Sequence, residues 1–269
     1  MDIYGLLGEK LSHSLSPEIH NELLKSIEKQ GIYKLFEIDK DSLLDFVKAI
    51  KLLKVKGCNV TIPYKKDIIK YIDEISKEAN SIGAINTIYL KDNKLYGYNT
   101  DYFGFGYLMK KANIDIKGKN AVILGNGGAA QAVLHYLLDN LVNKIYIVTR
   151  DKNKSNINLS NVNIISYEEL ENLSGDILIN TTPVGMYPNI NKSPVEKEIV
   201  KNFSHIVDLI YNPMETLFIK YAKEFKKNNI SGLYMLIGQA VKAQEIWNNK
   251  EIQSNIIEDI YIKLSESGI

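Results

Sequence analysis

Apolar and polar positions alternate along the whole chain in a way that predicts short strands separated by amphipathic helices. In the first part, the expected strands are 2–7, 33–38 and 57–62, the expected helices are 17–29, 43–52 and 64–75, and 84–90 and 94–97 form a hairpin. After a helix at 102–111, five more strands are expected at 121–124, 144–148, 162–165, 176–180 and 206–210. The pattern predicts an α/β protein in which an N-terminal α/β unit precedes a doubly wound parallel sheet.

A glycine-rich turn follows the apolar strand at 121–124. Its residues are Gly125, Asn126, Gly127, Gly128 and Ala129, and an amphipathic helix comes directly after them. A strand, such a turn and a helix together hold a dinucleotide pyrophosphate against backbone amides at the helix N-terminus. A flavin, another nucleotide or an empty structural turn remain as alternatives.

The late position of this turn predicts the domain order. Residues 102–237 are expected to bind the cofactor. Residues 1–101 are expected to bind substrate and carry the catalytic groups, joined by a C-terminal helix at 238–269. The net charge of +1 gives no reason to expect a nucleic acid or membrane partner, so a small molecule is the natural ligand.

The end of the second strand in the cofactor half bears on the choice of cofactor. Thr149, Arg150 and Asp151 stand there, and Lys152 and Lys154 follow closely. An arginine here meets the 2′-phosphate of NADP, whereas an acidic residue accepts the ribose hydroxyls of NAD. The basic residues favour NADP, and Asp151 keeps NAD open. A merely exposed basic loop is the other interpretation.

The loop that leaves the fourth strand of this half, 180–186, is expected near the nicotinamide. Ligands of open α/β sheets bind at the carboxyl ends of strands. Thr181 lies at that strand end, and Met186 can pack against the nicotinamide ring. An ordinary connecting loop fits the same residues.

Lys65 and Asp101 are the candidate catalytic residues. Reduction of a carbonyl by hydride needs a group that protonates the forming alkoxide, and a lysine held by a carboxylate meets this need. Lys65 is expected at the start of the helix at 64–75, near Asn59 and Thr61 on one face of the preceding strand. The alternative is that Lys65 is a surface lysine and that Asp101 caps the helix at 102–111.

Ser14 and Ser16 lie in a turn before the first helix, where hydroxyls can donate to a carboxylate of a small anionic substrate. Helix capping by Ser16 before Pro17 is the competing interpretation. The four histidines and one cysteine show no ligand spacing, so no metal is expected. The single cysteine and the absence of a signal-peptide pattern favour a cytoplasmic protein.

Eight segments occur together in an order typical of one family. They are Ser12–Pro17, Asn59–Lys65, Ile82–Thr87, Gly97–Asp101, Gly125–Ala129, Val184–Met186, Asp208–Pro213 and Leu236–Ala240. Across essentially its whole length the chain resembles the shikimate dehydrogenases. The resemblance implies an NADP-dependent oxidoreductase with a substrate domain and a Rossmann-like domain. Such an enzyme reduces 3-dehydroshikimate to shikimate on the pathway to chorismate and the aromatic amino acids.

The resemblance also implies roles for individual residues. It makes Lys65 the proton donor and Asp101 its partner and a ligand of a ring hydroxyl. Residues that match substrate ligands of the family are Ser14, Ser16, Asn59, Thr61, Asn86, Tyr211 and Gln239. Residues that match the cofactor site are Gly125, Asn126, Gly127, Gly128, Ala129, Thr149, Arg150, Lys154, Thr181 and Met186.

Two positions depart from the family pattern. Thr149-Arg150-Asp151 replaces the usual Asn-Arg-Thr, and Tyr234 stands where glycine is common. An NAD-preferring quinate/shikimate dehydrogenase is therefore the main alternative, and a non-catalytic NADP-binding module is a further one. A methyltransferase with a similar glycine loop is disfavoured by Arg150. Whether the protein is a monomer or a homodimer stays open.

Overall fold

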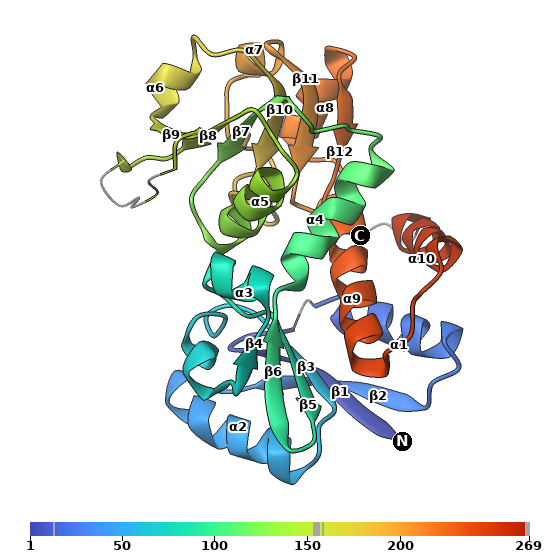
Figure 1. Ribbon diagram of the computed structural model, residues 1–269. Coiled ribbons are helices and arrows are strands. Elements are labelled where there is room, and N and C mark those ends of the chain that lie inside the picture. Colours follow the sequence, from blue (N-terminus) through green and yellow to red (C-terminus); the bar gives the residue numbers. More distant parts are fainter. Residues whose placement is uncertain (13, 153–156, 158, 267–269) are drawn as a thin grey trace. The chain divides into compact units, whose positions relative to one another are not determined.

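A computed structural model describes residues 1–12, 14–152, 157 and 159–266 of the chain (Figure 1). The chain divides into two compact units. The first unit comprises Met1–Gly104 and Ile237–Lys263, and the second comprises Phe105–Leu236 and Leu264–Ile269. These boundaries lie within a few residues of 101/102 and 237/238, and the C-terminal boundary at Lys263 has no counterpart in the sequence prediction.

The first unit is built on a mixed six-stranded sheet with the order β2-β1-β3-β5-β6-β4. Its strands are β1 (Asp2–Gly8), β2 (Gly31–Glu37), β3 (Gly57–Val60), β4 (Glu74–Ile75), β5 (Thr87–Lys91) and β6 (Lys94–Tyr98). Its helices are α1 (Ser16–Ser26), α2 (Leu43–Leu52) and α3 (Lys77–Ile82), together with the start of α4 (Thr100–Lys111) and most of α9 (Leu233–Asn248) and α10 (Ser254–Glu266).

Alternation along the strands sends apolar side chains to both faces of this sheet. On one face, Leu7, Cys58 and Val60 pack against α2. On the other face, Tyr4 and Tyr33 pack with Leu24 of α1 and Trp247 of α9. Helix α9 is thus part of the core of the first unit. The single helix expected at 238–269 is wrong: α9 begins five residues earlier, at Leu233, and ends at Asn248, and α10 is a separate helix.

The expected helix at 64–75 is wrong. The segment instead forms a turn, a 3-10 helix at Asp67–Tyr71 and the short edge strand β4. Asp73 donates its amide to Leu95 O at 3.0 Å, and its carboxylate accepts from Leu95 N at 2.7 Å. Pairing with β6 therefore overrides a helical apolar pattern, and Lys65 lies in the turn rather than on a helix.

The second unit is a six-stranded parallel sheet with the order β12-β11-β10-β7-β8-β9. Its strands are β7 (Asn120–Leu124), β8 (Lys144–Val148), β9 (Val162–Ile165), β10 (Gly175–Asn180), β11 (Phe203–Asp208) and β12 (Asn228–Ile230). Its remaining helices are α5 (Gly128–Asp139), α6 (Tyr167–Leu170), α7 (Lys197–Val200) and α8 (Leu217–Glu224). The strand order is that of a Rossmann fold, which confirms the predicted fold class.

The chain reverses its direction of winding between β7 and β10, and this is where ligands of such sheets bind. The sequence did not predict β12, because Asn228 and Asn229 carry no apolar alternation. No helix among the described residues is long and apolar enough to span a membrane.

Candidate active site

Lys65 is held in place by the turn between β3 and the 3-10 helix. The buried ring of Tyr64 anchors this turn, and its hydroxyl donates to Ile38 O. The Lys65 carbonyl accepts from Ile85 N at 2.8 Å, which ties the turn to the segment that precedes β5. The backbone of Lys65 is therefore fixed next to Asn86.

Asp101 lies in the first turn of α4. The helix begins at Thr100, and the side-chain oxygen of Asn99 accepts from Asp101 N at 3.1 Å. The amide of Asn99 in turn donates to Ala84 O at 3.0 Å. Asn99 therefore acts as the cap, and the interpretation of Asp101 as a helix cap is wrong. The Asp101 carboxylate remains available for other partners.

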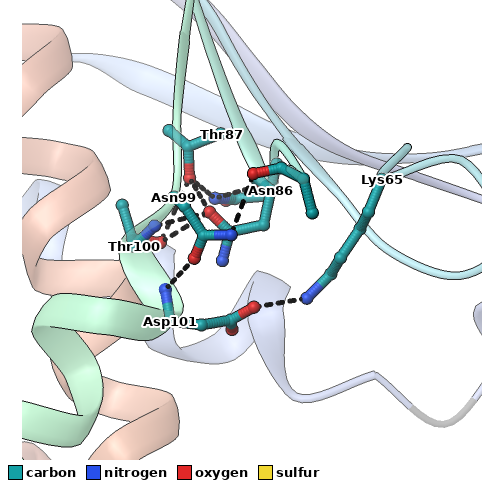
Figure 2. Close-up of polar contacts among 8 residues, drawn as sticks. Lys65, Asn86, Thr87, Asn99, Thr100 and Asp101 are labelled. Atoms are coloured by element: carbon teal, nitrogen blue, oxygen red, sulfur yellow. Dashed lines mark hydrogen bonds and ion pairs between the residues drawn. The ribbon is translucent and has the colours of Figure 1, made fainter. Parts of the chain in front are cut away.

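Lys65 and Asp101 form an ion pair with Nζ and Oδ2 2.6 Å apart (Figure 2). The Asp101 side chain is 7% exposed and the Lys65 side chain is 25% exposed, whereas the neighbouring Lys66 is exposed. The interpretation of Lys65 as an ordinary surface lysine is therefore wrong. A partly exposed ammonium held by a buried carboxylate can reach a ligand and transfer a proton to it.

Asn86 lies beside this pair, just before β5, and is buried. Its side-chain oxygen accepts from Thr100 N at 2.7 Å, from Thr100 Oγ1 at 3.2 Å and from Thr87 Oγ1 at 3.0 Å. Its amide nitrogen has no hydrogen-bond partner within the described part of the chain. An amide with one end so held presents the N–H groups of the other end to a ligand.

Asn59 and Thr61 lie at and just beyond the end of β3, both partly buried. The Asn59 oxygen accepts from Tyr33 Oη at 2.8 Å, and its nitrogen donates to Thr87 Oγ1 at 3.0 Å and to Asn86 O at 3.4 Å. The backbone amide of Thr61 donates to Leu7 O at 2.9 Å. Both amide hydrogens of Asn59 are thus directed at acceptors within the protein, which disfavours the direct contact with substrate that was expected.

Ser14, Ser16 and Gln239 complete the expected substrate residues of the first unit, and all three are partly buried. Ser14 Oγ accepts from Ser16 N at 3.2 Å. Helix α1 begins at Ser16 without a side-chain cap, so the interpretation of Ser16 as the capping residue is wrong. Gln239 lies on α9. The Ser16 hydroxyl is free of a capping role and can serve a ligand.

In the second unit, the residues of the glycine turn fit a dinucleotide pyrophosphate. Gly125 has a φ of +101°, and a Cβ there would lie 2.8 Å from Thr182 Cγ2, so only glycine suits the turn. A Cβ on Gly127 or Gly128 would meet nothing within 4 Å. Helix α5 begins at Gly128 without a side-chain cap. Its first amides are therefore open to an anion.

Further residues expected at the cofactor site are Asn126 in the glycine turn and the residues that follow β8. Asn126 Oδ1 accepts from Gln131 Nε2 at 2.8 Å, which fixes the Asn126 amide. Arg150 is exposed after the end of β8, and Thr149 Oγ1 accepts from Asp151 N at 3.3 Å. An exposed guanidinium at this strand end suits a 2′-phosphate. Lys154 lies outside the described residues.

The loops after β10 and β11 are joined by a buried carboxylate that the sequence did not reveal. Asp208 accepts from Thr216 Oγ1 at 2.6 Å, from Asn180 Nδ2 at 2.9 Å and from Ile210 N at 3.1 Å. Burial raises the pKa of Asp208 to about 6, and these hydrogen bonds oppose that rise. Asp208 is the last residue of β11, and its place at the start of the Asp208–Pro213 segment was the sequence feature that pointed to it.

Three expected residues lie on or near these loops of the second unit. The Thr181 hydroxyl donates to Leu124 O at 2.7 Å, which ties it to the last residue of the strand before the glycine turn. Met186 is 45% exposed. Tyr211 is partly buried and belongs to this unit, apart from the other expected substrate residues. Tyr234, which departs from the family pattern, is buried with the Lys111 ammonium over its ring at 5.4 Å.

Comparison with known proteins identifies the family of this chain. Residues 6–88 match the family model described as the shikimate dehydrogenase substrate binding domain. The protein named shikimate dehydrogenase (NADP(+)) from Clostridium beijerinckii is 52% identical over 262 residues, which is 97% of each chain.

Two solved structures extend the comparison. The crystal structure of shikimate dehydrogenase 1 from Peptoclostridium difficile is 51% identical with a TM-score of 0.91, and 98% of each chain is covered. A Thermus thermophilus shikimate 5-dehydrogenase, solved in complex with NADP(H) and shikimate, is 29% identical with a TM-score of 0.87. In that comparison 96% of this chain and 98% of the other are covered. Sequence identity over nearly the full length establishes that this chain belongs to the shikimate dehydrogenase family.

Proposed function

We propose that this protein is an NADP-dependent shikimate dehydrogenase that reduces 3-dehydroshikimate to shikimate, in the route to chorismate and the aromatic amino acids. The observation that carries the proposal is the Lys65–Asp101 ion pair next to the unpartnered amide nitrogen of Asn86. The names of full-length relatives support both the substrate and the cofactor.

We assign the substrate and the catalytic groups to residues 1–101 with the C-terminal helical segment, and the cofactor to residues 102–237. Bound NADPH supplies the hydride that reduces the carbonyl carbon. The Lys65 ammonium donates its proton to the oxygen that becomes the hydroxyl, and the Asp101 carboxylate keeps the lysine at that oxygen. In the reverse direction the lysine accepts this proton.

The other groups of the first unit hold the substrate. The Asn86 amide donates to a ring hydroxyl, and the hydroxyls of Ser14 and Ser16 donate to the carboxylate. Thr61 and Gln239 supply further polar contacts to the ring. None of these groups is cationic. The substrate carboxylate is therefore bound without a second ammonium that would compete with Lys65 for the Asp101 carboxylate.

In the cofactor half, the open amides at the start of α5 bind the pyrophosphate, and Arg150 binds the 2′-phosphate. The acidic side chain next to it, Asp151, favours the second candidate, an NAD-preferring quinate/shikimate dehydrogenase. A cytoplasmic location and a monomeric or dimeric state stay predictions from the sequence.

One assay tests both functions. The purified protein is mixed with shikimate or quinate and with NADP⁺ or NAD⁺ at equal concentrations, and absorbance of the reduced nicotinamide is followed. Fastest turnover with shikimate and NADP⁺ supports the proposal. A preference for NAD⁺ supports the second candidate, and absence of turnover in all four mixtures overturns both.

A further inference from the structure

Tyr33 lies on β2 behind the substrate site and is only 6% exposed. Its hydroxyl donates to Asn59 Oδ1 at 2.8 Å, and its ring stacks on His20 with the two ring centres 4.1 Å apart and the planes 9° apart. Burial, followed by the nearby Cys58 thiol, raises the pKa of Tyr33 well above its usual value, and a hydrogen bond with the Ser16 side chain opposes this rise. The hydroxyl is therefore a permanent donor toward Asn59.

The orientation of the Asn59 amide determines how Asn59 hydrogen-bonds Thr87. The Asn59 oxygen is turned to Tyr33, and the His20 ring is a further side-chain hydrogen-bond partner of Asn59. The amide nitrogen of Asn59 therefore faces Thr87 Oγ1 at 3.0 Å. Thr87 Oγ1 accepts there, so its own proton goes to Asn86 Oδ1 at 3.0 Å or to Thr100 Oγ1 at 3.1 Å. The Thr100 hydroxyl lies 3.2 Å from the same Asn86 oxygen, so both routes end on Asn86 Oδ1. An amide flip of Asn59 would turn its oxygen to Thr87 and draw the Thr87 proton away from Asn86.

This chain of hydrogen bonds ends at Asn86, the residue proposed to bind a substrate hydroxyl. Asn86 Oδ1 accepts from Thr87 and from both the amide and the hydroxyl of Thr100, which turns the Asn86 nitrogen away from these donors. Tyr33, Thr87 and Asn86 are buried and Asn59 is partly buried, so a missing donor leaves a poorly hydrated acceptor in this chain of hydrogen bonds.

We infer that Tyr33 is a positioning residue for the substrate site: its hydroxyl sets the amide orientation of Asn59 and, through Thr87, that of Asn86. The inference rests on the proposed function, in which the Asn86 amide binds a substrate hydroxyl. It also gives Asn59 a positioning role in place of the direct contact that the family resemblance implied.

The test is Tyr33→Phe, which removes the hydroxyl and keeps the ring that stacks on His20. Loss of one buried donor weakens the hold on Asn86 in the ground state and in the transition state alike. We expect the KM for shikimate and its dissociation constant by calorimetry to rise about tenfold, which corresponds to the loss of one such hydrogen bond. We expect kcat to change less than about threefold and the KM for NADP⁺ to stay the same.

Tyr4→Phe is the matched control. Tyr4 is also buried in the first unit, and its hydroxyl also donates to an asparagine oxygen, Asn248 Oδ1, at 2.8 Å. The Tyr4→Phe substitution removes the same kind of hydrogen bond and leaves the partners of Asn59 unchanged. We expect this variant to keep the wild-type KM for shikimate, even where its thermal midpoint falls as far as that of Tyr33→Phe.

A second comparison tests the route of the effect. If Tyr33 acts through Asn59, adding Tyr33→Phe to an Asn59→Leu variant produces little further rise in the KM for shikimate. Independent, multiplying effects of the two substitutions would overturn the inferred route.

The outcomes separate this inference from the proposed function. Wild-type turnover of shikimate with an unchanged KM in a folded Tyr33→Phe protein overturns the inference and leaves the function standing. Equal rises in KM for Tyr33→Phe and Tyr4→Phe overturn it as well. A wild-type protein that neither binds nor oxidises shikimate overturns the function, and the inference with it.

Discussion

Lys65 Nζ lies 2.6 Å from Asp101 Oδ2, although the two residues are 36 positions apart in the chain. The lysine lies in a turn held by the buried Tyr64, and the aspartate lies at the start of a helix capped by Asn99. Each backbone is fixed by contacts other than the ion pair itself. The ammonium is therefore oriented before any ligand binds, which is what proton transfer requires.

Replacing Lys65 tests its role as the proton donor. Lys65→Met keeps much of the apolar stem and removes the ammonium, so we expect kcat with shikimate to fall by about 10²- to 10⁴-fold. Binding of shikimate measured by calorimetry should change far less. Lys66→Met is the control, because Lys66 is the exposed neighbour. Near-normal turnover of Lys65→Met would remove this lysine from the mechanism.

Arg150 is expected to distinguish the two nicotinamide cofactors. Because its guanidinium is proposed to bind only the 2′-phosphate, Arg150→Ala should raise the KM for NADPH by about tenfold or more. NADH lacks this phosphate, so its KM serves as the internal control and should stay nearly constant. Steady-state kinetics with both cofactors decide the matter, and equal changes for the two would show that Arg150 does not contact the phosphate.

His20 is expected to make the protein less stable in mild acid. Burial lowers the pKa of His20 to about 3, and its hydrogen bond with Asn59 opposes this effect. The ring is neutral in the folded state and becomes protonated first in the unfolded chain. Its contribution to stability is therefore complete above pH 6.5 and is lost as the pH falls toward 3. Between pH 6.5 and 4 the loss is about 3 kcal/mol.

Urea unfolding of the wild type and of His20→Phe across pH 4–8 measures this contribution. Phenylalanine keeps the stacking on Tyr33 and Trp247 but cannot be protonated. The unfolding free energy of the wild type minus that of His20→Phe should therefore become smaller as the pH falls from 6.5 to 4. The opposing titration of Asp208, whose pKa is raised, occurs in both proteins and cancels in that difference. A difference that does not vary with pH would show that His20 is not held neutral.

Gly57→Ala should destabilise the first unit. A Cβ at this position would lie 2.2 Å from Trp247 Cε2. The indole cannot easily move, because Nε1 donates to Ile88 O at 2.9 Å and the ring stacks on Tyr4. We expect a loss of about 2–3 kcal/mol in the free energy of unfolding.

The emission of Trp247, the single tryptophan of the chain, reports this change directly. Gly118→Asn is the control. Gly118 has a φ of +71° that asparagine tolerates, and a Cβ there meets nothing within 4 Å. A Gly57→Ala protein as stable as the wild type would mean that the packing around Trp247 adapts.

The sequence by itself determined the fold class and the family. The apolar runs before Gly125 and Asn180 predicted buried parallel strands, and the glycine turn predicted a dinucleotide fold, since both depend on residues that are neighbours in the chain. The order of the eight motifs identified the family. Local patterns of this kind survive folding because they act over only a few residues.

The tertiary structure alone decided how the site is assembled. The helical apolar pattern at 64–75 was overridden when Asp73 paired with Leu95, which placed Lys65 in a turn. The partners of Lys65 and Asn59 come from distant elements, and no periodicity reports such pairings. For Tyr33 the sequence predicted only the start of a strand and no part in the site. A buried polar group takes whichever donor or acceptor the packed fold brings within reach, so its role is set by three-dimensional neighbours and not by its place in the chain.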